Sequence, residues 1–155
     1  MGPSTELTEV ALRKVMETNM LSLYWLTQAV IPGMVARRSG RIIFVASIAG
    51  VRGNGGSLSY GMTKAAGINA MCTLAVELGP HNIRCNTIAP GMIRTDMTES
   101  VMQDPLALGS YLSRNPSRIV GQPDEIAGAA VFLASAAGAY VNGHTLVIDG
   151  GHTQG

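Results

Sequence analysis

The chain has few charged residues, few aromatic residues and only two cysteines. Charged side chains make up 14% of its 155 residues and the formal net charge is +1, so no basic block typical of nucleic-acid binding is present. No apolar run reaches about 18 residues and no charged-then-apolar leader is seen, so neither a membrane span nor secretion is indicated. We therefore expect a cytoplasmic protein without a nucleic-acid or membrane partner.

The two cysteines lie far apart in apolar segments of the sequence. Cys72 falls in an apolar helical stretch and Cys85 in an apolar strand, so both are expected to be separate, reduced, buried thiols. Two cysteines cannot form a metal site without histidine or carboxylate ligands at suitable spacing, and we find none. No metal is predicted.

Apolar residues are abundant, and their spacing alternates between helical and strand patterns. They make up 46% of the chain, enough for one domain with a sizeable core. Helices are expected over residues 5–31, 57–79 and 123–134, and strands over 41–47, 83–89 and 146–148. Residues 92–118 are expected to be a loop with short helical pieces. This alternation predicts an α/β fold in which helices cover both faces of a parallel sheet.

Three polar residues surround a glycine-rich loop in the middle of the chain. Tyr60 and Lys64 share one helix face, where an ammonium group can stabilise a phenolate. Ser47 precedes Tyr60 by thirteen residues and ends the strand over 41–47, at the sheet edge where ligands bind in open α/β folds. A Tyr-x-x-x-Lys pattern also occurs by chance on many helices, but this context favours a proton-transfer site.

The motifs of the chain resemble those of the short-chain dehydrogenase/reductase family, above all its 3-oxoacyl-carrier-protein-reductase-like members. The resemblance lies in the set Ser47, Tyr60 and Lys64 and in three further segments. These segments are NIRCNTIAPGMIRTDM at 82–97, GQPDEIAGAAVFLAS at 121–135 and GHTLVIDGGH at 143–152. They occur in the family's order and, from about residue 19 onward, cover nearly the whole chain.

The resemblance implies a role for each of four residues. Tyr60 would be the general acid/base, Lys64 would contact the nicotinamide ribose and make Tyr60 more acidic, and Ser47 would hold the substrate oxygen. Asn19 lies where the family has a helix asparagine that anchors a water leading to the lysine. The alternative for Asn19 is a polar group that only bonds the helix backbone.

The resemblance also implies a site for the nicotinamide carboxamide between residues 90 and 95. The turn Pro90-Gly91 opens this segment, and the backbone of Ile93 and the hydroxyl of Thr95 are the expected contacts. Pro90-Gly91 could equally be an ordinary turn. The implied cofactor is NAD or NADP, with the choice unresolved.

The family's amino-terminal strand, its TGxxxGxG turn and its NNAG segment are not found in this sequence. The glycines at 50–56 have the wrong spacing for phosphate binding and are assigned to the active-site loop. We therefore predict one incomplete domain over 1–155, a partial Rossmann-like, doubly wound parallel sheet with the last three strands and their flanking helices.

An incomplete sheet predicts a partner for the chain. Unpaired backbone groups are expected beside Ile42, Ile43 and Phe44, and an open apolar edge invites pairing with another chain. The partner would be a chain that supplies the missing half or a second copy of this chain. The alternatives are a rearranged packing that covers the edge, or a sequence that is a fragment of a longer enzyme.

The first two long helices resemble the family's dimer contact, which implies a homodimer or homotetramer. Four apolar residues either line this contact or belong to the core: Leu23, Trp25, Met71 and Leu74.

Two functions are compatible with these features. The first is an NAD(P)-dependent oxidoreductase, or its catalytic part, that interconverts a carbonyl and a secondary alcohol with Tyr60 as the proton donor and acceptor. The second is a catalytically inactive assembly or regulatory subunit that cannot bind a dinucleotide alone. The apolar segment over 92–118 is expected to cover the substrate; the alternative is a pair of surface helices with a few buried Met and Leu residues. Neither alternative identifies the substrate.

Overall fold

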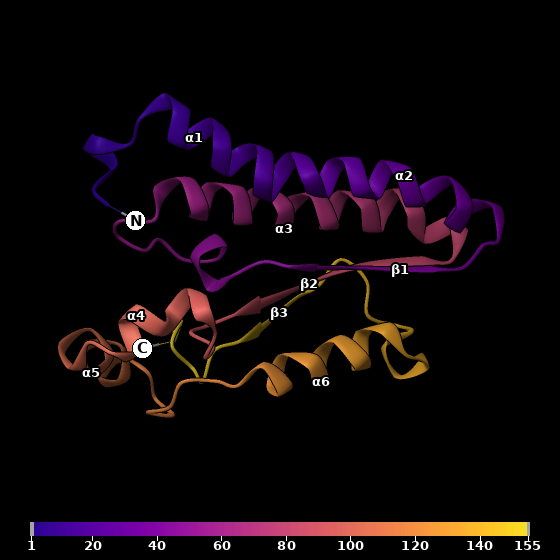
Figure 1. Ribbon diagram of the computed structural model, residues 1–155. Helices are drawn as coiled ribbons and strands as arrows, with labels where there is room; N and C mark the ends of the chain where they lie inside the picture. The colour runs from indigo at the N-terminus through magenta and orange to yellow at the C-terminus, as the bar shows by residue number, and fades with distance from the viewer. Residues whose placement is uncertain (1, 155) are drawn as a thin grey trace.

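The computed structural model describes residues 2–154 as a three-stranded parallel sheet with helices on both faces (Figure 1). The strands lie in the order β1 (Gly40–Val45), β2 (Ile83–Pro90) and β3 (Thr145–Ile148). The helices are α1 (Glu9–Met16), α2 (Ser22–Ala36), α3 (Leu58–Leu78), α4 (Glu99–Met102), α5 (Pro105–Arg114) and α6 (Pro123–Ala134). The predicted α/β class and parallel sheet are confirmed.

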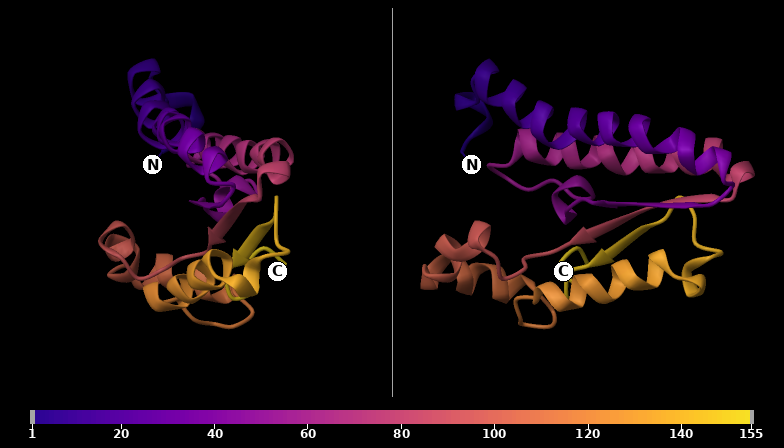
Figure 2. Two further views of the ribbon diagram at one scale, coloured as in Figure 1. Left: turned by 90° about the vertical axis from the view of Figure 1, so that its right-hand side faces the viewer. Right: turned by 45° about the vertical axis from the view of Figure 1, so that its right-hand side comes forward.

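Two helical layers enclose the sheet. Helices α2 and α3 lie along one face and α6 lies along the other, while α4 and α5 gather near the end at which the strands finish (Figures 1 and 2). The core beneath α3 contains Ile42 of β1, Met71 and Ala75 of α3, and Ile83 and Cys85 of β2. The carboxyl ends of β1 and β2 therefore share one edge of the sheet with the loop helices.

The first long helical stretch differs from its predicted bounds at both ends. Thr8 accepts a hydrogen bond from the Ala11 amide and caps α1, so the helix begins at Glu9 rather than at residue 5. At the other end, α2 continues through Pro32 to Ala36. Proline cannot donate a backbone hydrogen bond, so one carbonyl in the preceding turn lacks its usual partner; Pro32 is exposed, and water can bond that carbonyl. Met34, two residues later, packs on the core and favours continuation of the helix.

The bounds of the strands also differ slightly from the predicted bounds. Strand β1 ends at Val45, two residues before the predicted end, although the Ala46 amide still donates to the Ile88 carbonyl at 2.8 Å. Strand β2 extends to Pro90, whose ring nitrogen faces the side of β2 where β1 has already ended. No ladder hydrogen bond is lost there, which explains how a proline closes the central strand.

One expectation about burial was wrong, and the structure distinguishes the core residues among the four candidate contact residues. Cys85 is buried as expected, but Cys72 on α3 is exposed, with its Sγ 3.5 Å from the Gly143 carbonyl oxygen. Met71 belongs to the core with 1% exposure, and Leu23 and Leu74 pack partly against it, so of the four candidate contact residues only Trp25, with 63% exposure, is a surface residue. No helix within residues 2–154 has the length and apolar character needed to cross a bilayer.

Candidate active site

Ser47 lies just beyond β1, at the carboxyl edge of the sheet. Its backbone is extended and its Oγ accepts a hydrogen bond from the Ala49 amide at 3.2 Å, which caps a short 3₁₀ turn over Ile48–Gly50. The residue is half-buried. Ser47 thus belongs to the turn after the strand rather than to the strand itself.

Tyr60 and Lys64 lie one turn apart in the first half of α3, against the Ser47 turn. Two glycines allow this close approach. A Cβ atom on Gly50 would lie 2.7 Å from the Ala65 backbone nitrogen, and one on Gly61 would lie 2.8 Å from the Ala49 carbonyl oxygen. The structure therefore brings the turn that carries Ser47 directly onto the helix that carries Tyr60 and Lys64.

The Lys64 side chain reaches the end of β1. Its Nζ lies 5.1 Å from the centre of the Phe44 ring and 5.5 Å from the centre of the Tyr60 ring. Its hydrogen bond goes to the Val45 carbonyl oxygen, at 3.1 Å. Burial lowers the pKa of Lys64 below its ordinary value of 10.5 because it disfavours the charged form.

Asn19 lies in a π-helical turn over Glu17–Leu21, between α1 and α2. Such turns within helices frequently mark functional sites. The Asn19 Nδ2 donates to the Thr63 Oγ1 at 3.3 Å, and this hydroxyl donates to the Tyr60 carbonyl at 2.8 Å. Asn19 therefore reaches the helix turn of Tyr60 through a side chain, and the alternative of bonding only its own helix backbone is wrong.

Thr63 is a residue that sequence reasoning missed. Its side chain is 1% exposed, and it links the π-helical turn to α3. Its position three residues after Tyr60 is a sequence signal for the bond to the Tyr60 carbonyl. Nothing in the local sequence indicates the bond to Asn19, because that contact depends on how two helices cross.

The predicted carboxamide segment follows β2 at the same edge of the sheet. A Cβ atom on Gly91 would lie 2.8 Å from the Asp149 Cβ, so packing against the end of β3 explains this glycine. The Ile93 carbonyl accepts a hydrogen bond from Thr98, whereas the Ile93 amide has no acceptor within residues 2–154. The Thr95 side chain is exposed. A free amide beside an exposed hydroxyl fits a carboxamide, which needs both a donor and an acceptor.

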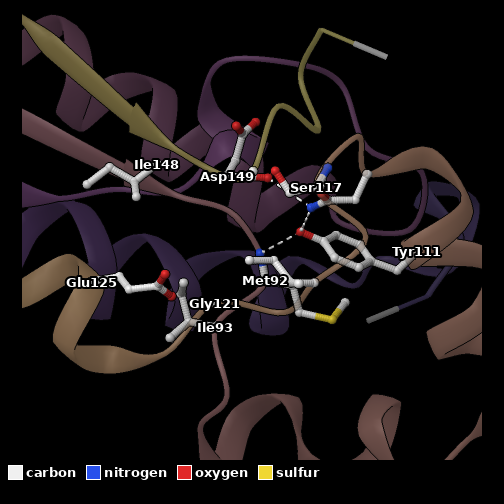
Figure 3. A pocket seen from close by; sticks show the side chains of 11 residues that line it. Met92, Ile93, Tyr111, Ser117, Gly121, Glu125, Ile148 and Asp149 are labelled. Atoms are coloured by element: carbon white, nitrogen blue, oxygen red, sulfur yellow. Dashed lines mark hydrogen bonds between the residues drawn. The ribbon is translucent and has the colours of Figure 1, made fainter.

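A hollow of about 220 Å³ lies beneath this segment, between the loop after β2, α5 and the start of α6 (Figure 3). The Met92 amide and the Asn115 Nδ2 both donate to the Tyr111 hydroxyl, at 3.2 and 3.1 Å. The Asn115 Nδ2 also donates to the Asp149 carbonyl at 3.0 Å. This network ties the segment after β2 to α5 and to the end of β3. Within residues 2–154, no group of three or more His, Cys, Asp or Glu residues could hold a metal ion.

The sequence matches a known family along almost its entire length. The profile described as enoyl-(acyl carrier protein) reductase matches residues 1–153. The 3-oxoacyl-(acyl-carrier-protein) reductase FabG of Vibrio harveyi is 42% identical over 137 residues, which are 88% of this chain and 55% of that protein. The corresponding protein of Chlamydia trachomatis is 46% identical over 137 residues, 88% of this chain and 54% of the relative. The chain thus spans about half the length of these curated relatives.

Solved structures agree with the sequence matches. Gluconate 5-dehydrogenase of Burkholderia cenocepacia, in complex with NADP and tartrate, is 31% identical with a TM-score of 0.97 over 99% of this chain and 60% of that one. A 4-hydroxyisoleucine dehydrogenase mutant, complexed with NADH and succinate, is 29% identical with a TM-score of 0.96 over 99% and 64% of the two chains. The profile match, the identities and the shared fold together show that this chain belongs to the short-chain dehydrogenase/reductase family.

Proposed function

We propose that the chain is the catalytic part of an NAD(P)-dependent oxidoreductase that interconverts a carbonyl and a secondary alcohol. The observation that carries the proposal is the close contact between the Ser47 turn and the helix of Tyr60 and Lys64, at the carboxyl edge of the sheet. In open α/β folds ligands bind at that edge. The two relatives of known structure, described above, hold NADP or NADH, and the proposal leaves the choice between these cofactors open.

The chain's own residues would position the substrate and move one proton. Tyr60 gives its hydroxyl proton to the carbonyl oxygen during reduction and takes it back during oxidation. Ser47 holds the same oxygen by a hydrogen bond, and the positive charge of Lys64 stabilises the phenolate form of Tyr60. Asn19, through Thr63, positions the turn that carries Tyr60.

The Ile93 amide and the Thr95 hydroxyl would orient the carboxamide of the cofactor, and the turn Pro90-Gly91 positions them. The nicotinamide supplies or accepts the hydride when it is bound. The polypeptide thus contributes alignment, a proton and electrostatic stabilisation.

The proposed partner is a polypeptide that carries the rest of the fold, since the relatives are nearly twice as long as their matched part. We also propose that the chain forms a homodimer or homotetramer through α2 and α3. A groove of about 470 Å³ lies between these helices, and exposed apolar side chains flank it on α2. These side chains are Tyr24, Trp25, Leu26 and Val30.

Cellular location is also part of the proposal. Cys72 and Cys85 are both free thiols, as expected for a reducing compartment, and we assign the enzyme to the cytoplasm.

The decisive experiment joins this chain to the unmatched part of the Vibrio harveyi relative and measures NADPH or NADH consumption. Acetoacetyl-coenzyme A tests a 3-oxoacyl substrate and 5-ketogluconate tests a sugar acid, following the names of the relatives. We expect Tyr60→Phe to lower kcat at least about 100-fold with little change in stability, because only the ionisable oxygen is lost. Near-normal turnover of this variant would contradict the role of Tyr60.

Calorimetry of the isolated chain tests the alternative, an inactive subunit that binds no dinucleotide alone. We expect binding of NADPH to be weak in the isolated chain and tight in the joined protein, because this sequence lacks the glycine-rich phosphate turn. A joined protein that binds NADPH but turns over no carbonyl would favour the inactive subunit.

A further inference from the structure

The turn after β3 packs closely against the segment that follows α5. Gly150 and Gly151 both adopt positive φ angles, of 63° and 86°, which favour glycine. A Cβ atom on Gly150 would lie 2.8 Å from the Asn115 Oδ1, and one on Gly151 would lie 3.1 Å from the Pro116 side chain. The Ser117 amide donates to the Gly150 carbonyl at 3.1 Å. The turn is therefore held in place relative to α5.

This turn carries His152, whose ring stacks on Tyr111 of α5. The ring centres lie 4.6 Å apart and the ring planes are inclined by 16°. Tyr111 is buried, with 8% exposure. The Nδ1 atom of His152 is also buried, and it has no hydrogen-bond partner in the described part of the chain. A neutral imidazole fits this environment best, because it can carry its single proton on Nε2.

Burial lowers the pKa of His152 below its ordinary value of 6.5, and charged groups on the surrounding elements modify this effect. Arg114 at the end of α5 and Arg52 in the loop before α3 both disfavour a positive charge on the ring, whereas Asp149 after β3 favours it. The carboxylate oxygens of Asp149 already accept hydrogen bonds from two backbone amides of the turn, at 2.9 and 2.7 Å. The ring is therefore neutral at neutral pH.

The Tyr111 hydroxyl connects this stack to the segment that is proposed to orient the carboxamide. It accepts hydrogen bonds from the Met92 amide at 3.2 Å and from the Asn115 Nδ2 at 3.1 Å (Figure 3). Met92 directly precedes Ile93, whose amide would bond the carboxamide. A rotation of the Tyr111 ring away from His152 would therefore also withdraw the acceptor of the Met92 amide.

We infer that His152 is a positioning residue for the proposed reaction: its neutral ring holds Tyr111, whose hydroxyl fixes the Met92 amide, and protonation of the ring undoes this arrangement. The inference rests on the proposed function, which gives the segment after β2 its task. An imidazolium has two N–H donors, so protonation would place a donor without an acceptor at the buried Nδ1 and a positive charge near two arginines. The ring would leave Tyr111 to reach water, and the contact with the cofactor would weaken.

NMR of the isolated chain tests the coupling. The ¹⁵N resonance of the Met92 amide should change with pH at the same midpoint as the His152 ring, below 6.5. Tyr111→Phe keeps the stack and removes the hydroxyl, so the His152 ring should still titrate but the Met92 amide should no longer follow it. His144→Phe is the matched control, because His144 is exposed just before β3 and should leave both titrations unchanged. A wild-type Met92 amide that does not respond to the His152 titration would overturn the inference.

Two substitutions of His152 in the joined protein test the effect on the cofactor. His152→Ala removes the stack and should raise the KM for the preferred cofactor, NADPH or NADH, at least about fivefold at pH 7, the lower end of typical coupling between linked sites. The kcat should change little, because a contact made equally before and during the reaction affects KM alone. His152→Phe keeps a ring against Tyr111 that cannot take up a proton. Its KM should stay low as the pH falls, whereas the wild-type KM should rise below the His152 midpoint.

Calorimetry of the same proteins with NADPH or NADH gives a readout that needs no turnover. The wild type and His152→Phe should bind the cofactor more tightly than His152→Ala does. Equal KM and equal affinity in the alanine and phenylalanine variants would overturn the inference. If carbonyl reduction still depends on Tyr60 in that case, the proposed function stands and only the role of His152 fails.

Discussion

Gly67 of α3 lies directly against the ring of Phe44 on β1, so closely that a Cβ atom at position 67 would overlap the ring edge. This contact sets the distance between the helix that carries Tyr60 and Lys64 and the strand that leads to Ser47. The same ring lies beneath the Lys64 ammonium. One glycine thus determines both the packing of α3 and the surface on which Lys64 lies.

Gly67→Ala should therefore destabilise the chain by about 1–3 kcal/mol, the usual cost of forcing a methyl group into a packed interior. Urea unfolding measures the change. Gly128→Ala on α6 is the matched control, because a Cβ atom there meets nothing within 4 Å and alanine gains up to about 1 kcal/mol in a helix. Equal effects of the two substitutions would contradict the packing argument.

The bond between Asn19 and Thr63 predicts an energetic coupling between the π-helical turn and α3. Asn19→Ala and Thr63→Val, alone and together, should give a coupling energy of about 0.5–1.5 kcal/mol in a double-mutant cycle, the range of a side-chain hydrogen bond. Thr73→Val provides the control, because its hydroxyl bonds only the Asn69 carbonyl of its own helix. A coupling no larger than that between Asn19 and Thr73 would show that the bond contributes nothing.

The local parts of the fold could be predicted because neighbours in the sequence determine them. The i,i+4 spacing predicted that Tyr60 and Lys64 share one helix face. The helix predicted over residues 123–134 is α6 of the structure, which spans Pro123–Ala134. The end of α2 could not be predicted from Pro32, because packing of Met34 on the core outweighs the loss of one hydrogen bond at a wet surface.

The contacts between elements could not be predicted. Helix α3 is apolar on several faces, so its sequence does not distinguish the buried Met71 from the exposed Cys72 or from Val76, which is 79% exposed. The bond from Lys64 to Val45 joins a flexible side chain to a backbone oxygen nineteen residues away. Such a contact depends on how α3 packs on β1 rather than on any local pattern in the chain.

The lowered pKa of Lys64 predicts a pH dependence of stability. Burial holds this pKa below 10.5, so the unfolded chain binds the proton more tightly than the folded chain does. Between the folded-state pKa and 10.5, Lys64 has lost its proton in the folded chain but keeps it in the unfolded chain. The contribution of Lys64 to the free energy of unfolding should therefore rise with pH across this window. Urea unfolding at several pH values measures this rise as the difference between the wild-type chain and Lys64→Met. Parallel curves for the two proteins would refute the prediction.

The two thiols should differ sharply in reactivity. Cys85 is fully buried in the core, and burial raises its pKa to about 11. Cys72 is exposed, and its Sγ lies 3.5 Å from the Gly143 carbonyl oxygen. Ellman's reagent at mildly alkaline pH measures this difference, because it reacts with an accessible thiolate. We expect it to modify Cys72 of the folded chain rapidly and Cys85 only after unfolding in guanidinium. Cys72→Ser should abolish the rapid phase and Cys85→Ser should preserve it. Rapid modification of both cysteines in the folded wild-type chain would show that the sheet around Cys85 opens far more readily than its packing indicates.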